Sequence, residues 1–160
     1  MSIGLSKLNK NLICVTIGDI EGIGVHLLLK EFKRKKIKDF ILLTNINIFN
    51  KHVKFPKNKI NIVKKINFIN YNKNKLNIFS FKTKNKNSNT IDALKYSYEF
   101  TKKNIFLGIL TLPLNKNKLN KSLNNKFIDQ TTFFSKKENQ DYSNMIFYHK
   151  NKFFIPLTIH

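Results

Sequence analysis

The stretch LICVTIGDIEGIG, residues 12–24, decides the fold of this chain. Residues 11–17 are mostly apolar with little alternation, which is typical of a strand that is covered on both faces. A glycine-rich turn follows, and behind it apolar side chains recur at helical spacing, at Val25, Leu28, Leu29 and Phe32. Residues 40–44 form a second apolar run. Strand, helix and strand within about 35 residues predict the βαβ unit of a parallel sheet.

The middle of the chain leaves the order of the strands open. Residues 60–63 and 76–81 alternate between apolar and polar side chains and predict half-buried strands. Residues 82–89 are polar without periodicity and predict a loop. Thr90 is then placed to cap a helix that runs from residue 91 to about residue 103.

Toward the C-terminus the sequence predicts a buried strand, two short helical segments and a hairpin. These are a strand over 105–110 before Pro113, a lysine-rich helix over 116–123, and a helix or turn that begins near Gln130. Two apolar runs, 145–148 and 153–157, flank His149 to Lys152 and predict an antiparallel hairpin. Residues 1–160 are therefore interpreted as one α/β domain region, with a mostly parallel sheet, flanking helices and a C-terminal β-hairpin.

Size and cysteine content narrow the class of protein. The 160 residues, 41% of them hydrophobic, are enough for one domain with a core. No apolar run approaches the roughly 20 residues that cross a bilayer, so no membrane segment is expected. Cys14 is the single cysteine, which excludes an internal disulfide and favours the reducing cytoplasm. Its place in a predicted buried strand indicates a core residue rather than a nucleophile.

The net charge of +21 raises the alternative of a nucleic-acid-binding module. The positive charge is almost entirely lysine, spread along the whole chain, and Arg34 is the single arginine. Specific base recognition depends on the planar guanidinium group, which this chain nearly lacks. We therefore expect a solvated lysine surface that binds nucleic acid only nonspecifically, at low salt.

The glycine turn has two interpretations. Glycine permits a close approach of backbone to ligand, and the start of the following helix offers free N–H groups to an anion. Gly18, Gly22 and Gly24 are not spaced as in the dinucleotide fingerprint GxGxxG, however. A tight strand-to-helix turn without a ligand remains the alternative.

Three later segments carry the remaining candidate site residues: LTLPLNK at 110–116, FIDQTTFF at 127–134 and FIPLTIH at 154–160. In this order, the glycine turn and these segments resemble the N-terminal half of the 4-hydroxythreonine-4-phosphate dehydrogenase family. The turn is similar to the family's Gly-Asp-Pro-Ala-Gly-Ile-Gly, and residues 110–116 to its Val-Thr-Ala-Pro-Ile-Asn-Lys. Residues 127–134 resemble Phe-x-Gly-His-Thr-Glu-Phe, and the last segment resembles a strand that ends in Ala-Leu-Val-Thr-Thr-His. The resemblance covers most of residues 11–45 and 91–160.

The resemblance implies an isocitrate/isopropylmalate dehydrogenase-like fold and NAD-dependent oxidation of 4-hydroxy-L-threonine phosphate in pyridoxal phosphate (vitamin B6) biosynthesis. By the same resemblance, Gln130 and Thr131 bind the phosphorylated substrate, Lys116 contacts its anionic group, and His160 binds a divalent metal (zinc, magnesium or cobalt). A cytoplasmic homodimer is implied. The family's other metal ligands and most of its nucleotide site lie in a second half, so we expect a truncated enzyme that is inactive as this fragment.

Several residues depart from the family pattern. Glu21 stands where the family has alanine and adds negative charge near a site that must admit phosphate. Gln130 replaces the family's histidine, and glutamine forms hydrogen bonds but does not titrate near neutral pH. Asp129 replaces a glycine and adds a further negative charge. These departures keep open the alternative of a non-catalytic remnant.

Overall fold

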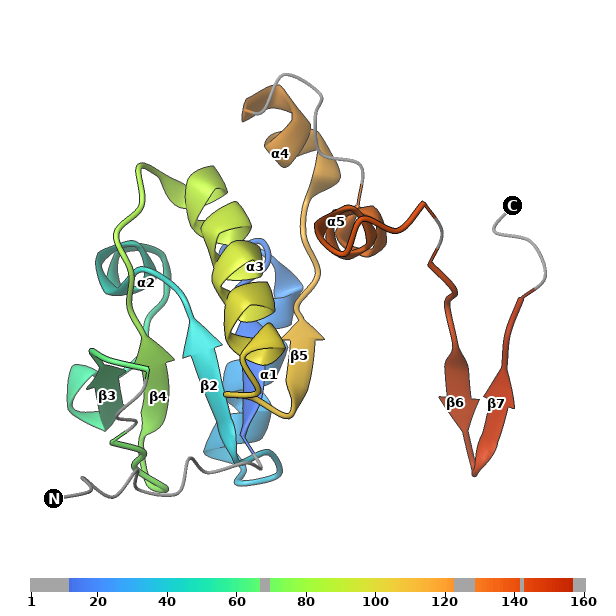
Figure 1. Ribbon diagram of the computed structural model, residues 1–160. Helices are drawn as coiled ribbons and strands as arrows, with labels where there is room; N and C mark the ends of the chain where they lie inside the picture. Colours follow the sequence, from blue (N-terminus) through green and yellow to red (C-terminus); the bar gives the residue numbers. More distant parts are fainter. Residues whose placement is uncertain (1–11, 67–69, 123–128, 142, 157–160) are drawn as a thin grey trace, which may run out of the picture.

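A computed structural model of the chain describes residues 12–66, 70–122, 129–141 and 143–156 (Figure 1). Within these residues, five parallel strands form one sheet in the order β3-β4-β2-β1-β5. The strands are β1 (Ile13–Thr16), β2 (Phe40–Leu43), β3 (Ile60–Val63), β4 (Leu76–Phe79) and β5 (Gly108–Thr111). Thr16 at the end of β1 pairs with Leu43 of β2 and with Thr111 of β5. The carboxyl ends of the three strands therefore lie level at one edge of the sheet.

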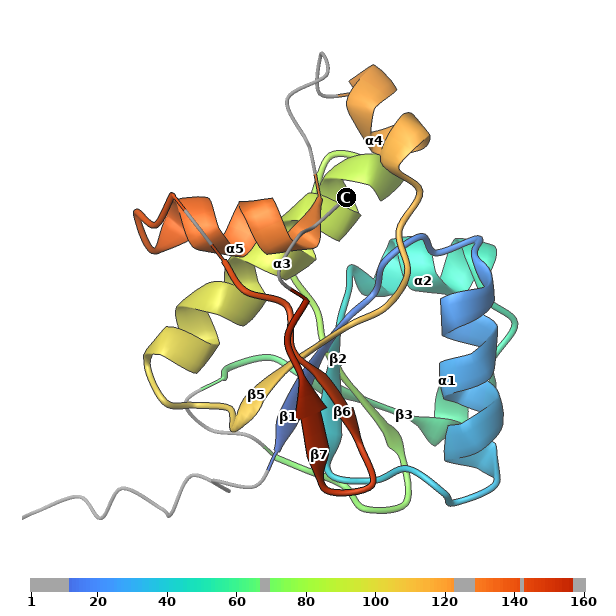
Figure 2. The same ribbon diagram turned by 90° about the vertical axis from the view of Figure 1, so that its right-hand side faces the viewer.

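Helices cover both faces of this sheet. They are α1 (Ile23–Lys33), α2 (Ile46–His52), α3 (Lys86–Lys102), α4 (Lys116–Ser122) and α5 (Gln130–Lys137), with a 3₁₀ turn η1 (Lys57–Lys59). Figures 1 and 2 show α1 on one face and α3 on the other, with α4 beyond the carboxyl ends of the strands. The α/β sheet is confirmed, and so are the strand, the helix and the second strand predicted from residues 12–44.

The chain reverses its direction of travel across the sheet at β1. From β1 it passes through α1 to β2 on one side, whereas from β4 it crosses through α3 to β5 on the other side. β1 and β5 are neighbouring strands, yet the helix that follows β1 (α1) covers one face of the sheet and the helix that leads to β5 (α3) covers the other. Such a switch point opens a crevice at the carboxyl ends of the strands, where ligands of open α/β sheets bind.

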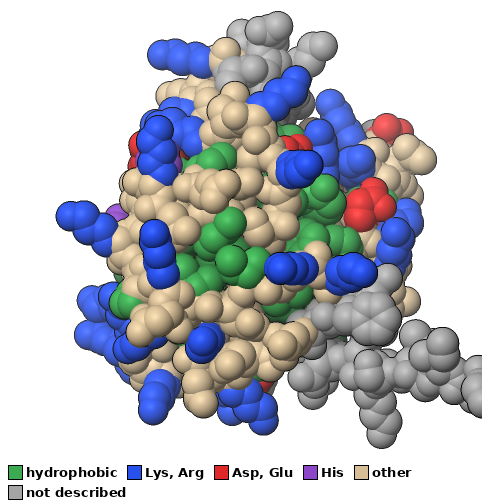
Figure 3. Space-filling view, turned by 90° about the vertical axis from the view of Figure 1, so that its left-hand side faces the viewer, with side chains coloured by type: hydrophobic (Ala, Val, Ile, Leu, Met, Phe, Trp, Pro, Cys, Tyr) green, Lys and Arg blue, Asp and Glu red, His purple; other side chains and the backbone are tan. Residues whose placement is uncertain are grey.

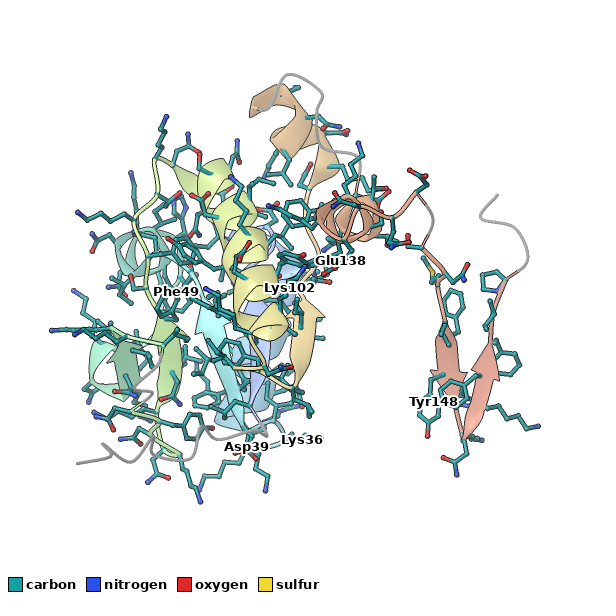
Figure 4. The ribbon with its side chains drawn as sticks, viewed as in Figure 1. Lys36, Asp39, Phe49, Lys102, Glu138 and Tyr148 are labelled. Atoms are coloured by element: carbon teal, nitrogen blue, oxygen red, sulfur yellow. The ribbon has the colours of Figure 1, made fainter. Side chains whose placement is uncertain are left out.

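The predicted C-terminal hairpin is present as β6 (Phe147–His149) and β7 (Lys152–Phe154). Its turn residues Lys150 and Asn151 have φ of 45° and 62°, as a two-residue turn between twisted strands requires. The hairpin stands away from the main sheet in Figure 1, and Figure 4 shows Tyr148 on it, remote from the core. Phe153 is 71% exposed.

The core lies between the sheet and its helices. Cys14, in the interior strand β1, and Phe49, which α2 directs toward the sheet (Figure 4), are completely buried. Burial raises the pKa of the Cys14 thiol, so Cys14 is a core residue, as predicted. Among the described residues, no helix combines the length and the apolar character that a membrane crossing needs.

The structure corrects two predicted strands. β4 is buried along its whole length rather than half-buried, because the amide of Asn77 is satisfied internally: it donates to the carbonyls of Asn72 and Lys75. Residues 105–110 are not one buried strand. Ile105 and Phe106 are buried ahead of β5, whereas β5 itself is an edge strand with Leu110 49% exposed.

The predicted start of the third helix is also wrong. Helix α3 begins at Lys86, and the Asn85 side chain caps it by accepting from the backbone N–H groups of Asn87 and Ser88. The stretch predicted as a loop therefore contributes the first turn of α3. Thr90 lies inside the helix, and its hydroxyl donates to the carbonyl of Gly18 at 2.6 Å.

Because α3 begins at Lys86, Asn89 lies within the helix, where its side chain contacts the end of β2. Asn89 is completely buried; its amide nitrogen donates to the Thr44 hydroxyl at 3.0 Å, and its amide oxygen accepts from Asn45 N–H at 2.8 Å. Asn45 in turn caps α2. One buried amide thus joins β2, α2 and α3.

We expect the substitution Asn89→Ala to lower the free energy of unfolding by about 2–3 kcal/mol, because it leaves buried donors and acceptors without partners. Urea unfolding followed by circular dichroism measures this loss. Asn47→Ala, on the exposed side of α2, is the matched control and should change stability by less than about 0.5 kcal/mol. Equal effects of the two substitutions would contradict the role of Asn89.

Candidate functional site at the carboxyl edge of the sheet

The glycine turn packs directly against the segment that follows β5. Gly18 has φ of +62°, and a Cβ atom added to it would lie 2.7 Å from the Leu112 carbonyl oxygen and in contact with that of Pro113. A Cβ on Gly24 would lie 2.7 Å from Pro113 Cδ. The Asp19 N–H donates to the Pro113 carbonyl at 2.9 Å. Two of the predicted motifs, nearly a hundred residues apart in sequence, are therefore held together at the switch point.

The third motif reaches the same peptide. The Gln130 side chain donates from Nε2 to the Leu112 carbonyl oxygen at 3.2 Å. Asp129 caps α5 by accepting from the Thr132 N–H at 2.7 Å, which fixes the start of the helix beside this contact. Gly18 and Gln130 thus approach the Leu112 peptide from two different elements.

The far end of α5 is fastened to α3. The Tyr98 hydroxyl donates to the Lys137 carbonyl at 3.0 Å, and Lys102 Nζ lies 2.8 Å from that hydroxyl. Lys102 also forms an ion pair with Glu138 at 3.3 Å, and Figure 4 shows the two labelled side chains close together. The nearby Tyr98 hydroxyl and the Lys102 ammonium group lower the pKa of Glu138.

An open pocket of about 350 Å³ lies beside the glycine turn. It is lined by Asp19, Gly22, Ile23, Pro113, Leu114, Asn115, Lys116 and Asn117. A much smaller hollow adjoins it and shares Asp19, Leu114 and Asn115, with Lys86, Asn87, Thr90 and Lys118 on its other sides. The lining of the large pocket combines apolar and polar side chains, and both signs of charge face it, from Asp19 and Lys116.

Glu21, in the glycine turn, is the centre of an ion-pair cluster beside these hollows. Its carboxylate lies 2.9 Å from Lys86 Nζ, 3.2 Å from Lys118 Nζ and 3.2 Å from His52 Nδ1. Lys118 also pairs with Asp19 at 3.2 Å. Hydrogen bonds from Lys86 and then Lys118 lower the pKa of Glu21 to about 2, and hydrogen bonds to Asp19 and Glu21 raise the pKa of Lys118.

The structure brings some of the predicted site residues together. Lys116 begins α4 and lines the large pocket, and Gln130 lies at the adjoining Leu112 peptide. Thr131 is exposed on α5 and does not line that pocket. His160, the predicted metal ligand, lies outside the described residues. The substrate and metal roles of these four residues stay predictions.

In the described part of the chain, the side chains form no three-ligand group for a metal, and Gly18 and Gly24 leave no open space for a pyrophosphate. No group of three or more His, Cys, Asp or Glu side chains that could hold an ion occurs in the described part of the chain. The space that Gly18 and Gly24 leave open is filled by Leu112 and Pro113, so these glycines serve chain packing. The described residues therefore fit neither a three-ligand metal site nor a cradle for the NAD pyrophosphate.

Sequence reasoning missed the residues that meet Glu21. Lys86 fell in a predicted loop, and Lys118 is one of many lysines, so nothing in their spacing distinguished them. His52 ends α2, a helix that the sequence did not predict. The one indication of this cluster in the sequence is Glu21 itself, because the family that the turn resembles has alanine at this position.

The fold and the switch-point crevice define an α/β protein that holds its site at the carboxyl edge of a parallel sheet. Residues 25–160 match the model of the pyridoxal phosphate biosynthetic protein PdxA family. Because the match extends over most of the sequence, the chain belongs to this family.

Solved structures support the fold. The chain is similar to 4-hydroxythreonine-4-phosphate dehydrogenase from Klebsiella pneumoniae, with a TM-score of 0.78 and 14% identity, over 94% of this chain and 50% of that one. The enzyme of the same name from Burkholderia phymatum gives 0.72 and 14%, over 91% and 48%. The chain thus spans about half the length of these structures. A comparison with curated protein sequences gave no significant match.

We expect Gly18→Ala to lower the free energy of unfolding by about 2 kcal/mol or more, because a side chain both disfavours positive φ and meets the carbonyls of residues 112 and 113. Gly108→Ala is the matched control: nothing lies within 4 Å of its added Cβ, and strand propensity favours alanine. Chemical unfolding of both variants measures the difference. A Gly18→Ala protein as stable as Gly108→Ala would contradict the close packing.

The depressed pKa of Glu21 predicts a pH dependence of stability. The carboxylate is charged in the folded state down to about pH 2, whereas the unfolded chain protonates it near pH 4.5. The stabilisation is therefore complete above pH 4.5 and is lost as the pH falls toward 2. We expect the stability difference between the unsubstituted protein and Glu21→Gln to shrink across this interval in urea unfolding. A difference that stays constant from pH 6 to 2 would contradict the ion cluster.

Proposed function

We propose that this chain is the N-terminal part of a 4-hydroxythreonine-4-phosphate dehydrogenase. The proposed reaction is the NAD-dependent oxidation of 4-hydroxy-L-threonine 4-phosphate in pyridoxal phosphate biosynthesis. The observation that carries the proposal is the convergence of the glycine turn, residues 112–116 and Gln130 at the switch point of the sheet, in a chain of the PdxA family. Residues 1–160 by themselves form one wall of the substrate cleft and do not turn over.

Each proposed role rests on the chemistry of the side chain. Lys116, at the mouth of the large pocket, provides an ammonium group for the substrate phosphate. Gln130 and the hydroxyl of Thr131 form hydrogen bonds to the rest of the substrate without exchanging protons near neutral pH. NAD and a divalent metal supply the redox and Lewis-acid chemistry in this proposal, and their ligands lie outside the described residues, with His160 as one of them. A cytoplasmic homodimer completes the proposal.

On one face of the molecule, the arrangement of positive charge is unlike that of a nucleic-acid-binding surface. Figure 3 shows this face, on which Lys and Arg side chains are scattered singly or in small groups, and hydrophobic side chains lie exposed among them near the middle. A nucleic-acid surface gathers its cations into a patch or stripe. On this face they do not gather.

The test is a titration of the isotopically labelled 160-residue protein with 4-hydroxy-L-threonine 4-phosphate, followed by NMR. We expect shifts at Lys116, Gln130 and Thr131, and an affinity about fivefold weaker for Lys116→Gln, since an exposed ion contact is worth about 1 kcal/mol. Lys121→Gln is the control, because it removes the same charge from the same helix outside the pocket lining.

The same protein, with NAD and zinc, magnesium or cobalt added, is monitored for NADH by absorbance. No NADH is expected from residues 1–160 alone. Turnover would refute the proposed inactivity of the fragment. The proposed cleft would be refuted if the substrate changed NMR chemical shifts only on other surfaces, or if the two lysine substitutions weakened substrate affinity equally.

A further inference from the structure

Glu21 lies where two ammonium groups and a histidine ring from three different elements meet. His52 ends α2, Lys86 begins α3 and Lys118 lies in α4, and each contacts the Glu21 carboxylate at 3.2 Å or less. Lys86 Nζ contacts both carboxylate oxygens at 2.9 Å. We refer to His52, Lys86 and Lys118 as the cation cluster.

The cation cluster is built by the fold rather than by local sequence. Lys86 and Lys118 lie 65 and 97 residues from the glutamate they share. The chain carries 30 Lys and Arg against nine Asp and Glu, so like charges are expected to spread apart over its surface. The repulsion between the two ammonium groups is offset by the carboxylates that they contact, which are Glu21 for both lysines and Asp19 for Lys118.

The surroundings of the cation cluster suit a small anion. Lys86 and Lys118 line the small hollow together with Asn87 and Asn115, whose side-chain amides can donate hydrogen bonds. That hollow opens beside the large pocket, with which it shares Asp19, Leu114 and Asn115. A phosphate group at the cluster would therefore have two ammonium groups and amide donors around it, with the Asp19 carboxylate on one side, and the large pocket beside it would take the rest of a ligand.

We propose that the cation cluster is a binding site for the phosphate group of a small molecule, and that Glu21 occupies it as an internal ligand that phosphate must displace. Glu21 lies in a turn and its side chain is 38% exposed, so it can leave without disturbing the core. Ion pairs this exposed are weak, so displacement is thermodynamically accessible. The lowered pKa of Glu21 supports the same assignment, because it reports how strongly the cluster favours negative charge.

Removal of the Glu21 charge should leave the cluster in place. Lys118 keeps its ion pair with Asp19 at 3.2 Å, and Lys86 is fixed in the first turn of α3 by the Asn85 cap. Glu21→Gln therefore converts a neutralised site into a net positive one with little change of shape. The inference depends only on these contacts and not on the proposed dehydrogenase reaction.

The test measures the affinity of inorganic phosphate at constant ionic strength by NMR, for the unsubstituted protein and for Glu21→Gln. We expect about tenfold tighter binding by Glu21→Gln, with the largest shifts at Lys86, Lys118 and His52. Adding Lys86→Gln to Glu21→Gln should abolish the gain. Circular dichroism and thermal unfolding confirm that the variants are folded.

The matched control is Glu31→Gln, which removes the same charge from α1, where Glu31 pairs with Arg34 at 3.3 Å. Equal gains for Glu31→Gln and Glu21→Gln would show a net-charge effect only and overturn the proposal. Unchanged phosphate affinity in Glu21→Gln would overturn it as well. If Glu21→Gln does not fold, the unsubstituted protein provides the test. We expect saturating phosphate to change the NMR chemical shift of the Glu21 carboxyl carbon, and an unchanged chemical shift would refute the displacement of Glu21. If phosphate binds as expected but 4-hydroxy-L-threonine 4-phosphate does not bind, the phosphate site is supported and the proposed dehydrogenase function is refuted.

Discussion

The backbone of Gly18 lies against the carbonyls of Leu112 and Pro113, and the site depends on this close approach. β1 and β5 are neighbours in the sheet, but neighbouring strands alone do not bring the loops that leave them together. The positive φ of Gly18 turns the chain toward β5, and the absence of a side chain lets the two backbones meet. The Thr90 hydroxyl holds the Gly18 carbonyl from α3, and Gln130 holds the Leu112 carbonyl from α5. One backbone contact thus connects four elements at the carboxyl edge of the sheet.

The same contact explains why charged side chains gather here. The turn that begins at Gly18 carries Asp19 and Glu21 to the edge of the sheet, and the segment that follows Pro113 carries Lys116 and Lys118 to the same edge. Opposite charges then come within ion-pair distance without any local sequence relation. Because these side chains remain partly exposed, solvent screening reduces the stability that their pairs contribute to folding. Their arrangement bears on ligand binding as well as on stability.

The sequence predicted what depends on short-range pattern. The apolar run before Gly18, the helical spacing from Val25 to Phe32 and the turn between β6 and β7 are local signals, and each element is present. Prediction was wrong where tertiary contacts decide. Asn77 looked like the exposed member of an alternating strand, yet it is 2% exposed, because Asn61 and Asn72 satisfy it. The meeting of Lys86 and Lys118 at Glu21 joins residues far apart in sequence, and one chain offers no local signal for it.

Ile20 and Glu21 show how this chain keeps the family's turn while it changes the chemistry. They stand where the resembling family has proline and alanine. Ile20 is 3% exposed and fills the core beneath the turn, whereas Glu21 points to the exposed side, among the cation cluster. The conformation of the turn rests on Gly18 and on the Asp19 contact with Pro113, and neither Ile20 nor Glu21 takes part in these contacts. Geometry and charge at this turn are therefore set by different residues. Gly18 and Gly24 hold the turn against residues 112 and 113, and Glu21 decides which anions the edge of the sheet accepts.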